Sequence, residues 1–547
     1  MDKRIDRMLD QYPAAVFKNR KDHLLEKTEE KTGPITANTR TIPGIITNRG
    51  CCYAGCKGVV LGPLRDAVVI THGPIGCGYY TWGTRRNKGR SEKGEKNFLN
   101  YCFSTDLQEG DIVFGGEKKL KAAIEDAVRI FAPSTVFVCS TCPVGLIGDD
   151  IHAVARWATE TFGIKVVSFS CEGYKGVSQS GGHHIANNGL ITHVIGTGDK
   201  AVGRYAINLL GEYNIGGDGF EIERLLKAIG YDVVSVMTGN GTVEDLSNAH
   251  KAQLNLVQCH RSINYIGEMM KTKYGTDWIK VNFIGVRSTA KSLRDVAKYF
   301  GDPDLAARTE QVIADELADI EADLAHFRTI TEGKTAALFV GGSRAHHYQK
   351  LLGDLGVKTI MAGYEFAHRD DYEGREVIPT IREDADSKNI ESIEVSPDAA
   401  HYRVVLTPDQ YAALEKEISL NAYAGMIREM ENGSYVVDDL NHFETEQLLK
   451  ILKPDIFCSG IKDKYVAHKA GIFSKQLHSY DYSGPYAGFR GAVTFARDIA
   501  MGLSTPSWQL VTPPWKTEPM LTGSVVAPGK PSVAAHAAVP GKEALHA

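Results

Sequence analysis

The sequence predicts an α/β protein with three doubly wound, Rossmann-like units, each built on a parallel sheet. Short apolar runs rich in β-branched residues alternate with amphipathic segments of helical period along most of the chain. The 547 residues are too many for a single hydrophobic core. Cysteines recur where apolar runs end, and that is the place where open α/β sheets bind ligands.

Composition restricts the possible functions. With a net charge of −5, the chain lacks the basic excess that nucleic acid binding requires. No apolar run is long enough to span a bilayer, and the charged start has no apolar signal core. We therefore expect a cytoplasmic protein without nucleic acid or membrane partners, whose ten cysteines stay reduced and serve metal or redox chemistry. Cys139 and Cys142 form a lone CxxC pair, so a closed structural zinc site is not expected.

The first 40 residues form a charged, helix-forming arm with few core residues. A surface helix and a subunit clamp account for this arm equally well. The first α/β unit spans residues 41–195. In it DAVVITHG, EGDIVFGG and STVFVCSTC predict strands, and EKKLKAAIEDAVRIFA predicts an amphipathic helix.

Two further units follow. Residues 196–332 continue the alternation, with AQLNLVQC predicted as a strand that ends at Cys259. Residues 333–517 form the third unit, in which His478 lies in an aromatic, Gly/Pro-rich loop before a helix. A charged stretch at about 374–424 is predicted to be a surface insertion, and the Pro/Ala/Gly/Val-rich tail 518–547 is predicted to be disordered.

Three cysteines lie in loops that favour metal ligation. Cys51 and Cys77 stand in glycine-rich turns on either side of the DAVVITHG strand, and Cys142 follows the STVFVCSTC strand. A free cysteine is usually a small buried hydrophobe, and for any one of these thiols that reading is the better one. Repetition of the strand–thiol–loop pattern favours ligation for the group.

Other loops carry polar groups suited to a ligand. The Gly-Gly-His-His run at 181–184 is placed for proton transfer or hydrogen bonding near neutral pH. The turn from Gly341 to Arg344 would present bare backbone and one guanidinium to a ligand, without the pattern of a dinucleotide site.

Eight motifs in order identify a family resemblance: RGCCYAG, HGPIGCG, CPVGLIGDD, SQSGGHHIAN, LNLVQCHRS, GYEFAHRDDY, SGIKDK and HSYDYSGPY. Over nearly the whole of 40–516, apart from the insertion, the chain closely resembles the alpha chains of nitrogenase molybdenum–iron proteins. The resemblance implies three α/β units around a buried metal cofactor. It also implies an α2β2 heterotetramer with a nitrogenase beta chain, and a transient, ATP-dependent nitrogenase iron protein as electron donor.

Site residues follow from the same motifs, position by position. The resemblance implies Cys51, Cys77 and Cys142 as ligands of the P-cluster, an iron–sulfur cluster shared with the beta chain. It implies Cys259 on the terminal iron and His478 on the molybdenum of an iron–molybdenum cofactor that carries homocitrate. Soft thiolates suit iron–sulfur clusters, and imidazole suits a metal at the other end.

The residues around the cofactor are also implied. Val59 matches a side chain that gates one cofactor face, and Gln179 and Lys462 match residues near homocitrate. The shell around the cofactor sulfurs matches Arg85, His183, Arg344, Gly341 and Gly342. The cysteines that match no ligand are expected to pack as ordinary core residues: Cys52, Cys56, Cys102, Cys139, Cys171 and Cys458.

The resemblance implies an enzyme that reduces dinitrogen to ammonia, and protons to hydrogen, with electrons that pass through the P-cluster. Two alternatives stay open: a scaffold paralogue that assembles the cofactor, and the vanadium or iron-only enzymes. Cys259, His478, Gln179 and Lys462 together favour the enzyme over the scaffold. Tyr480, Ala487 and Trp82 depart from the commonest family pattern, which leaves local hydrogen bonding around the site open.

Overall fold

The computed structural model describes residues 2–11, 20–31, 35–36, 50–83, 88–91, 93–174, 179–258, 263–340, 342–364, 409, 412–413, 416, 422–423, 425–438, 440–460, 463–505 and 507. The predicted insertion lies almost entirely outside these residues, and the tail 518–547 lies wholly outside them. None of the described helices combines the length and apolar character that crossing a bilayer requires.

The first sheet has four parallel strands in the order β4-β3-β5-β6. Buried β-branched runs form its two central strands, since both faces are covered by other elements. Its strands are β3 (Ala67–His72), β4 (Phe103–Ser104), β5 (Thr135–Ser140) and β6 (Lys165–Phe169). Its helices are η2, a π-helix (Ala54–Leu61), α2 (Ile75–Gly83), α3 (Glu109–Phe114), α4 (Glu117–Phe131), α5 (Cys142–Ile147), α6 (Ile151–Phe162) and α7 (Gln179–His193).

One strand predicted from the sequence is wrong: residues 109–114 form α3. The side chain of Gln108 and that of Asp111 form a capping box that starts this helix. Its apolar residues face outward, because Val113 is 67% and Phe114 90% exposed. The apolar run in this segment predicts a strand, whereas in the structure it forms an exposed helix.

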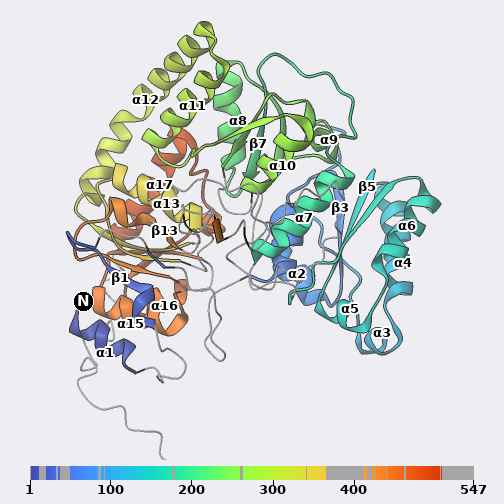
Figure 1. Ribbon diagram of the computed structural model, residues 1–547, viewed down its shortest axis with the longest axis horizontal. Helices are drawn as coiled ribbons and strands as arrows, with labels where there is room; N and C mark the ends of the chain where they lie inside the picture. Colours follow the sequence, from blue (N-terminus) through green and yellow to red (C-terminus); the bar gives the residue numbers. More distant parts are fainter. Residues whose placement is uncertain are drawn as a thin grey trace, which may run out of the picture.

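The second sheet is also parallel, in the order β10-β9-β7-β8. Its strands are β7 (Ala206–Glu212), β8 (Asp232–Thr238), β9 (Leu254–Val257) and β10 (Asp277–Lys280). Its helices are α8 (Asp218–Ile229), α9 (Val243–Ser247), α10 (Asn264–Tyr274), α11 (Val286–Phe300) and α12 (Pro303–Thr331). The long helix α12 packs along α17 (Gly488–Ser504) of the third unit, so it joins the second and third units (Figure 1).

The third sheet has the order β1-β14-β12-β11-β15-β16, parallel except for β1. Its strands are β1 (Leu24–Glu26), β11 (Thr335–Phe339), β12 (Lys358–Gly363), β14 (Tyr435–Val437), β15 (Ile456–Ser459) and β16 (Phe473–Gln476). Its helices are α13 (Gly342–Asp354), α15 (His442–Leu452), α16 (Lys464–Lys469) and α17 (Gly488–Ser504). The α/β class with parallel sheets is therefore confirmed, while the predicted domain boundaries stay a prediction.

The N-terminal arm differs from its prediction as a helix with few core residues. Helix α1 (Lys3–Leu9) packs against α15 and buries Ile5, Met8 and Leu9 in the core of the third unit. Arg20, 4% exposed, forms an ion pair with the buried Glu444. Strand β1 then pairs with β14 at the sheet edge, so the described part of the arm belongs structurally to the third unit.

Candidate metal centres

The three predicted cluster thiols lie close to one edge of the first sheet. Cys77 is in the first turn of α2, just after β3, and Cys142 is the first residue of α5, just after β5. Strands β3 and β5 are parallel neighbours, so both thiols follow carboxyl ends at the same sheet edge. Cys51 stands immediately before the helical segment that leads into η2.

Gly173 brings two of these thiols together. A Cβ atom placed on Gly173 would lie 3.0 Å from Cys142 Sγ and 3.4 Å from Cys51 Sγ. The backbone N–H of Gly173 donates to Cys142 Sγ over 3.2 Å. Close backbone approach and a donor to sulfur are what an iron–sulfur cluster needs around its thiolates, so these residues fit such a group.

The same thiols are not sealed inside the chain. Cys51 is exposed, and Cys77 and Cys142 are half-buried. Partial burial raises the pKa of Cys77, and the neighbouring charges of Cys51 and Cys142 raise it further, which shows that the three thiols interact. An open, three-thiol set of this kind leaves one side for further ligands from outside the chain.

Glycine contacts fix η2 against α7. A Cβ on Gly55 would lie 1.9 Å from the backbone oxygen of Gln179, and one on Gly182 would lie 1.8 Å from the backbone oxygen of Cys52. Only glycine permits backbones to approach this closely. The contact sets the position of buried Val59 on η2 relative to Gln179 and to buried His183 on α7.

Helix α7 also carries buried polar groups that lack partners. The side-chain amides of Asn187 and Asn188 are buried, and no described residue bonds to them. Buried amides usually have hydrogen-bond partners, so this face of α7 has capacity for an additional polar group. His183, one turn before Asn187, is 5% exposed, and its ring centroid lies 6.3 Å from that of Tyr213.

His478 and Arg344 lie at the carboxyl edge of the third sheet. His478 follows β16, and its ring packs on Gly460, at which a Cβ would lie 3.0 Å from His478 Cε1. Its Nε2 is 3.4 Å from the backbone oxygen of Val340, just after β11. Arg344 is in the first turn of α13, whose first residue is Gly342. An imidazole and a guanidinium at one sheet edge suit a metal-containing anion.

Tyr480 ties Arg344 to a buried carboxylate. Arg344 Nη1 donates to Tyr480 Oη over 3.0 Å, and that hydroxyl donates to Asp218 Oδ2. The backbone N–H of Ala487 donates to Asp218 Oδ1 over 3.0 Å. The two hydroxyl contacts give a physical reason for Tyr480, one departure from the commonest family pattern, whereas the contact of Ala487, another departure, uses only its backbone. Sequence reasoning missed Asp218, because an aspartate at a helix start looks like an ordinary cap.

Glu212, at the end of β7, is a further buried acid that was missed from the sequence. Its one visible signal is a carboxylate that ends an otherwise apolar strand. Burial, and then the charge of Asp218, raise the pKa of Glu212 to about 7. The carboxyl is therefore placed to exchange a proton near neutral pH.

Replacing Glu212 by glutamine should make stability less dependent on pH. The unfolded chain releases the Glu212 proton near the ordinary value of 4.5, and the folded chain only near 7. The original chain therefore loses stability as pH rises through that window, by roughly 3 kcal/mol for this one group. The thermal unfolding midpoint of Glu212→Gln, relative to that of the unsubstituted chain, should therefore rise between pH 5 and pH 8. A constant difference across that range would contradict the raised pKa.

A cavity of about 360 Å³ lies where the first unit meets the loop after His478. Its walls come from η2, α2 and that loop, and they include Lys57, Trp82 and Tyr482. Trp82, another departure from the family pattern, donates its indole N–H to the backbone oxygen of Leu99 over 2.9 Å.

Four predicted site residues lie outside the described part of the chain: Arg85, Cys259, Gly341 and Lys462. Strand β9 lies within the predicted segment but ends at Val257, two residues before Cys259, at which the sequence predicted its end. The roles of all the predicted site residues stay predictions.

Comparison with known proteins places the chain among characterised relatives. The family model for nitrogenase component 1 type oxidoreductases matches residues 51–504. The nitrogenase molybdenum-iron protein alpha chain of Clostridium pasteurianum is 59% identical, over 93% of this chain and 96% of the relative. Its counterpart from Methanosarcina barkeri is 52% identical, over 94% and 97%. The solved structure of nitrogenase Cp1 at pH 6.5 superposes with a TM-score of 0.83 at 58% identity, covering 94% of this chain and 100% of that one.

Proposed function

This chain belongs to the nitrogenase component 1 type oxidoreductases, and we propose that it acts as the alpha subunit of a molybdenum nitrogenase. Its reaction is the reduction of dinitrogen to ammonia, with reduction of protons to hydrogen. The observation that carries the proposal is the separation of its donors into two groups. Thiols stand at an open edge of the first sheet, while His478 and Arg344 stand at the inner edge of the third.

The open thiol group is the alpha-chain half of the P-cluster site. Cys51, Cys77 and Cys142 supply thiolates, and the N–H of Gly173 stabilises the sulfur of Cys142. A bound P-cluster supplies one-electron transfer. Because these thiols are partly exposed, the remaining ligands come from a beta chain that covers this edge.

The surface around these thiols supports such a partner. Helices α2 and α5, which carry Cys77 and Cys142, lie with α3 along one border of the first unit (Figure 1). Large apolar side chains on and near these helices are exposed. They are Ile75, Tyr79, Tyr80, Tyr101, Val113, Phe114, Leu146 and Tyr174. Exposed apolar patches of this extent mark protein interfaces, and aromatic residues are enriched in them. The partner in this proposal is the beta chain of an α2β2 heterotetramer.

The inner group holds the iron–molybdenum cofactor with homocitrate. His478 and Cys259 would supply its metal ligands, and Arg344, held by Tyr480, would offset its negative charge. Bound cofactor supplies the multi-electron reduction of dinitrogen. Gln179 and Lys462 hold homocitrate, Arg85, Gly341 and Gly342 line the cofactor sulfurs, and Val59 limits access to one face. His183 donates a hydrogen bond or a proton there.

Turnover with purified components tests this function. The chain, produced anaerobically with its beta chain and molybdate, is mixed with nitrogenase iron protein, ATP and ¹⁵N-labelled dinitrogen. Labelled ammonia should form, and omission of ATP should abolish it. Cofactor-loaded protein that forms no ammonia, yet passes its cofactor to a cofactor-free acceptor, would instead identify an assembly scaffold.

A further inference from the structure

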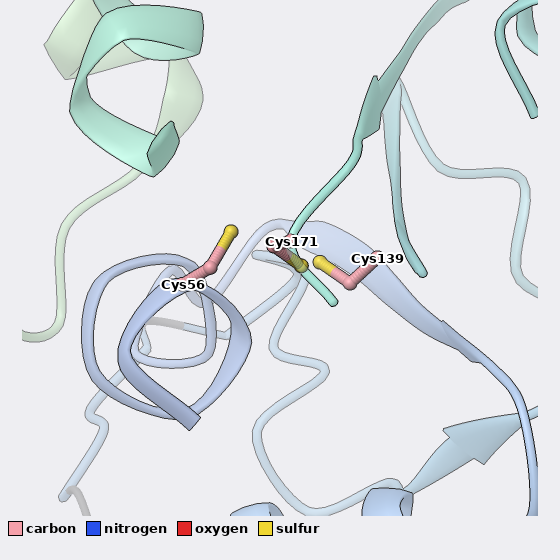
Figure 2. A group of neighbouring side chains, drawn as sticks. All are labelled: Cys56, Cys139 and Cys171. Atoms are coloured by element: carbon pink, nitrogen blue, oxygen red, sulfur yellow. The ribbon is translucent and has the colours of Figure 1, made fainter. Parts of the chain in front are cut away.

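Three cysteines that were expected to be ordinary core residues lie together inside the first unit. The sulfur atoms of Cys56, Cys139 and Cys171 are all within 4.8 Å of one another. Figure 2 shows the sulfurs of Cys139 and Cys171 side by side, with Cys56 approaching from the neighbouring helical turn. All three residues are 0% exposed. None of them belongs to the predicted P-cluster set, which lies at the open edge.

Each thiol comes from a different element. Cys56 is on η2, Cys139 is in β5, and Cys171 follows β6, the parallel neighbour of β5. They are 83 and 32 residues apart in the sequence, so no short CxxC motif predicts that they lie together. A fourth buried thiol, Cys52, stands one turn before Cys56. This explains how a thiol cluster can exist where sequence spacing gave no reason to expect a zinc site.

The surrounding hydrogen bonds hold the group in place. The backbone N–H of Cys171 donates to Ser140 Oγ over 3.2 Å, and Ser140 Oγ in turn donates to the backbone oxygen of Phe169 over 3.1 Å. Cys171 Sγ lies 3.5 Å from the backbone oxygen of Ser140. These bonds fix the loop of Cys171 to the end of β5, so two of the sulfurs are positioned by the sheet itself.

We propose that Cys56, Cys139 and Cys171 form a binding site for one divalent thiophilic cation, zinc or ferrous iron. A cation that bonds three thiolates at about 2.3 Å requires sulfur atoms roughly 4 Å apart. The observed separations need only a small contraction to reach that geometry. Thiolate sulfur is the donor type that these soft cations select.

Charge favours a divalent cation over a monovalent one. Lys57, next to Cys56 in the chain, is 5% exposed, so a cationic side chain is buried beside the three thiols. Three thiolates around a divalent cation leave one negative charge, which the ammonium of Lys57 cancels. A monovalent cation would leave a second negative charge buried without compensation. The site and Lys57 together are neutral only with the divalent ion.

Binding needs only proton release. As the three sulfurs bond the cation, any proton that a thiol still carries is released to solvent, so three metal–sulfur bonds form at the expense of the S–H bonds present. No oxidant or reductant is needed.

The bound cation would be structural. Because the site is closed to solvent, the ion enters while the chain folds, before η2 closes over the sheet. The bound ion then cross-links η2 to β5 and to the loop after β6. Since Cys51 lies just before η2, this cross-link also restricts the position of the loop that carries the first predicted P-cluster ligand.

Anomalous X-ray diffraction tests the site directly. Crystals of the anaerobically purified complex are measured above and below the zinc and iron absorption edges. We expect one peak among the sulfurs of Cys56, Cys139 and Cys171, present in the original protein and lost in Cys139→Ala and Cys171→Ala. Cys458→Ala is the matched control, because Cys458 is also 0% exposed but lies in β15 of the third sheet. That variant should keep the peak.

Two results would overturn the proposal. One is the absence of a peak at both edges in the original protein, and the other is a peak that persists in Cys139→Ala. The first result needs no variant to fold, so the test stands even if the substitutions prevent folding. The readout is independent of turnover, so failure of the nitrogenase assay would leave it unchanged.

Discussion

His478→Ala is expected to empty the molybdenum end of the buried site while the chain stays folded. His478 lies in the loop after β16, where its ring packs on Gly460. The loop keeps its own anchors, including the ion pair between Lys464 and Asp481. Removal of a residue that only hydrogen-bonds to a metal ligand already weakens metal affinity by about 10–100-fold. Removal of the ligand itself should therefore lower the molybdenum content to below about a tenth of that of the unsubstituted protein.

Metal analysis and electron paramagnetic resonance measure this effect. Molybdenum per chain should collapse in His478→Ala, while the signals of the P-cluster persist, because the thiols proposed as its ligands lie at the edge of a different sheet. His326→Ala, a change at an exposed histidine on α12, is the control and should change neither. Stoichiometric molybdenum in His478→Ala would mean that His478 is an ordinary packing residue.

The second large effect is expected from Gly182→Ala, on α7. Helix propensity alone predicts a gain of about 1 kcal/mol for alanine inside a helix. The new Cβ, however, would lie 1.8 Å from the backbone oxygen of Cys52 and 2.6 Å from the backbone nitrogen of Cys56. Backbone atoms on both sides cannot yield as a flexible side chain does, so we expect a loss of about 3 kcal/mol or more.

This substitution should also disturb both metal sites, because η2 connects them. Displacement of η2 from α7 moves Cys51 on one side and Val59 on the other. Gly110→Ala is the matched control, since a Cβ there meets nothing within 4 Å. Urea unfolding and iron content measure both effects. A Gly182→Ala protein as stable as the original would refute the close packing of η2 and α7.

Much of the fold follows from local patterns in the sequence. The alternation of β-branched runs with amphipathic helices predicts the parallel sheets, because buried parallel strands require continuous apolar runs. The prediction is wrong at residues 109–114, because a short apolar run is compatible with a strand and with an exposed helix. The sequence also does not predict strand β1 in the arm, because β1 pairs with β14, more than 400 residues away.

The candidate sites, too, contain some features that local sequence predicts and others that it does not. The sequence singles out Cys77 through the repeated strand–thiol–loop pattern and His478 through the family resemblance, and the ligand roles of both stay predictions. The link between Arg344, Tyr480 and Asp218, and the cluster of Cys56, Cys139 and Cys171, depend on distant segments that meet in space. No local pattern carries that information.

The most direct test of the account is an anomalous map of the purified complex at the molybdenum absorption edge. The account predicts one molybdenum peak per alpha chain, bonded to the imidazole of His478, together with iron density that touches Cys51, Cys77 and Cys142. Molybdenum located away from His478 in an active preparation, or iron density that touches none of those three thiols, would contradict it.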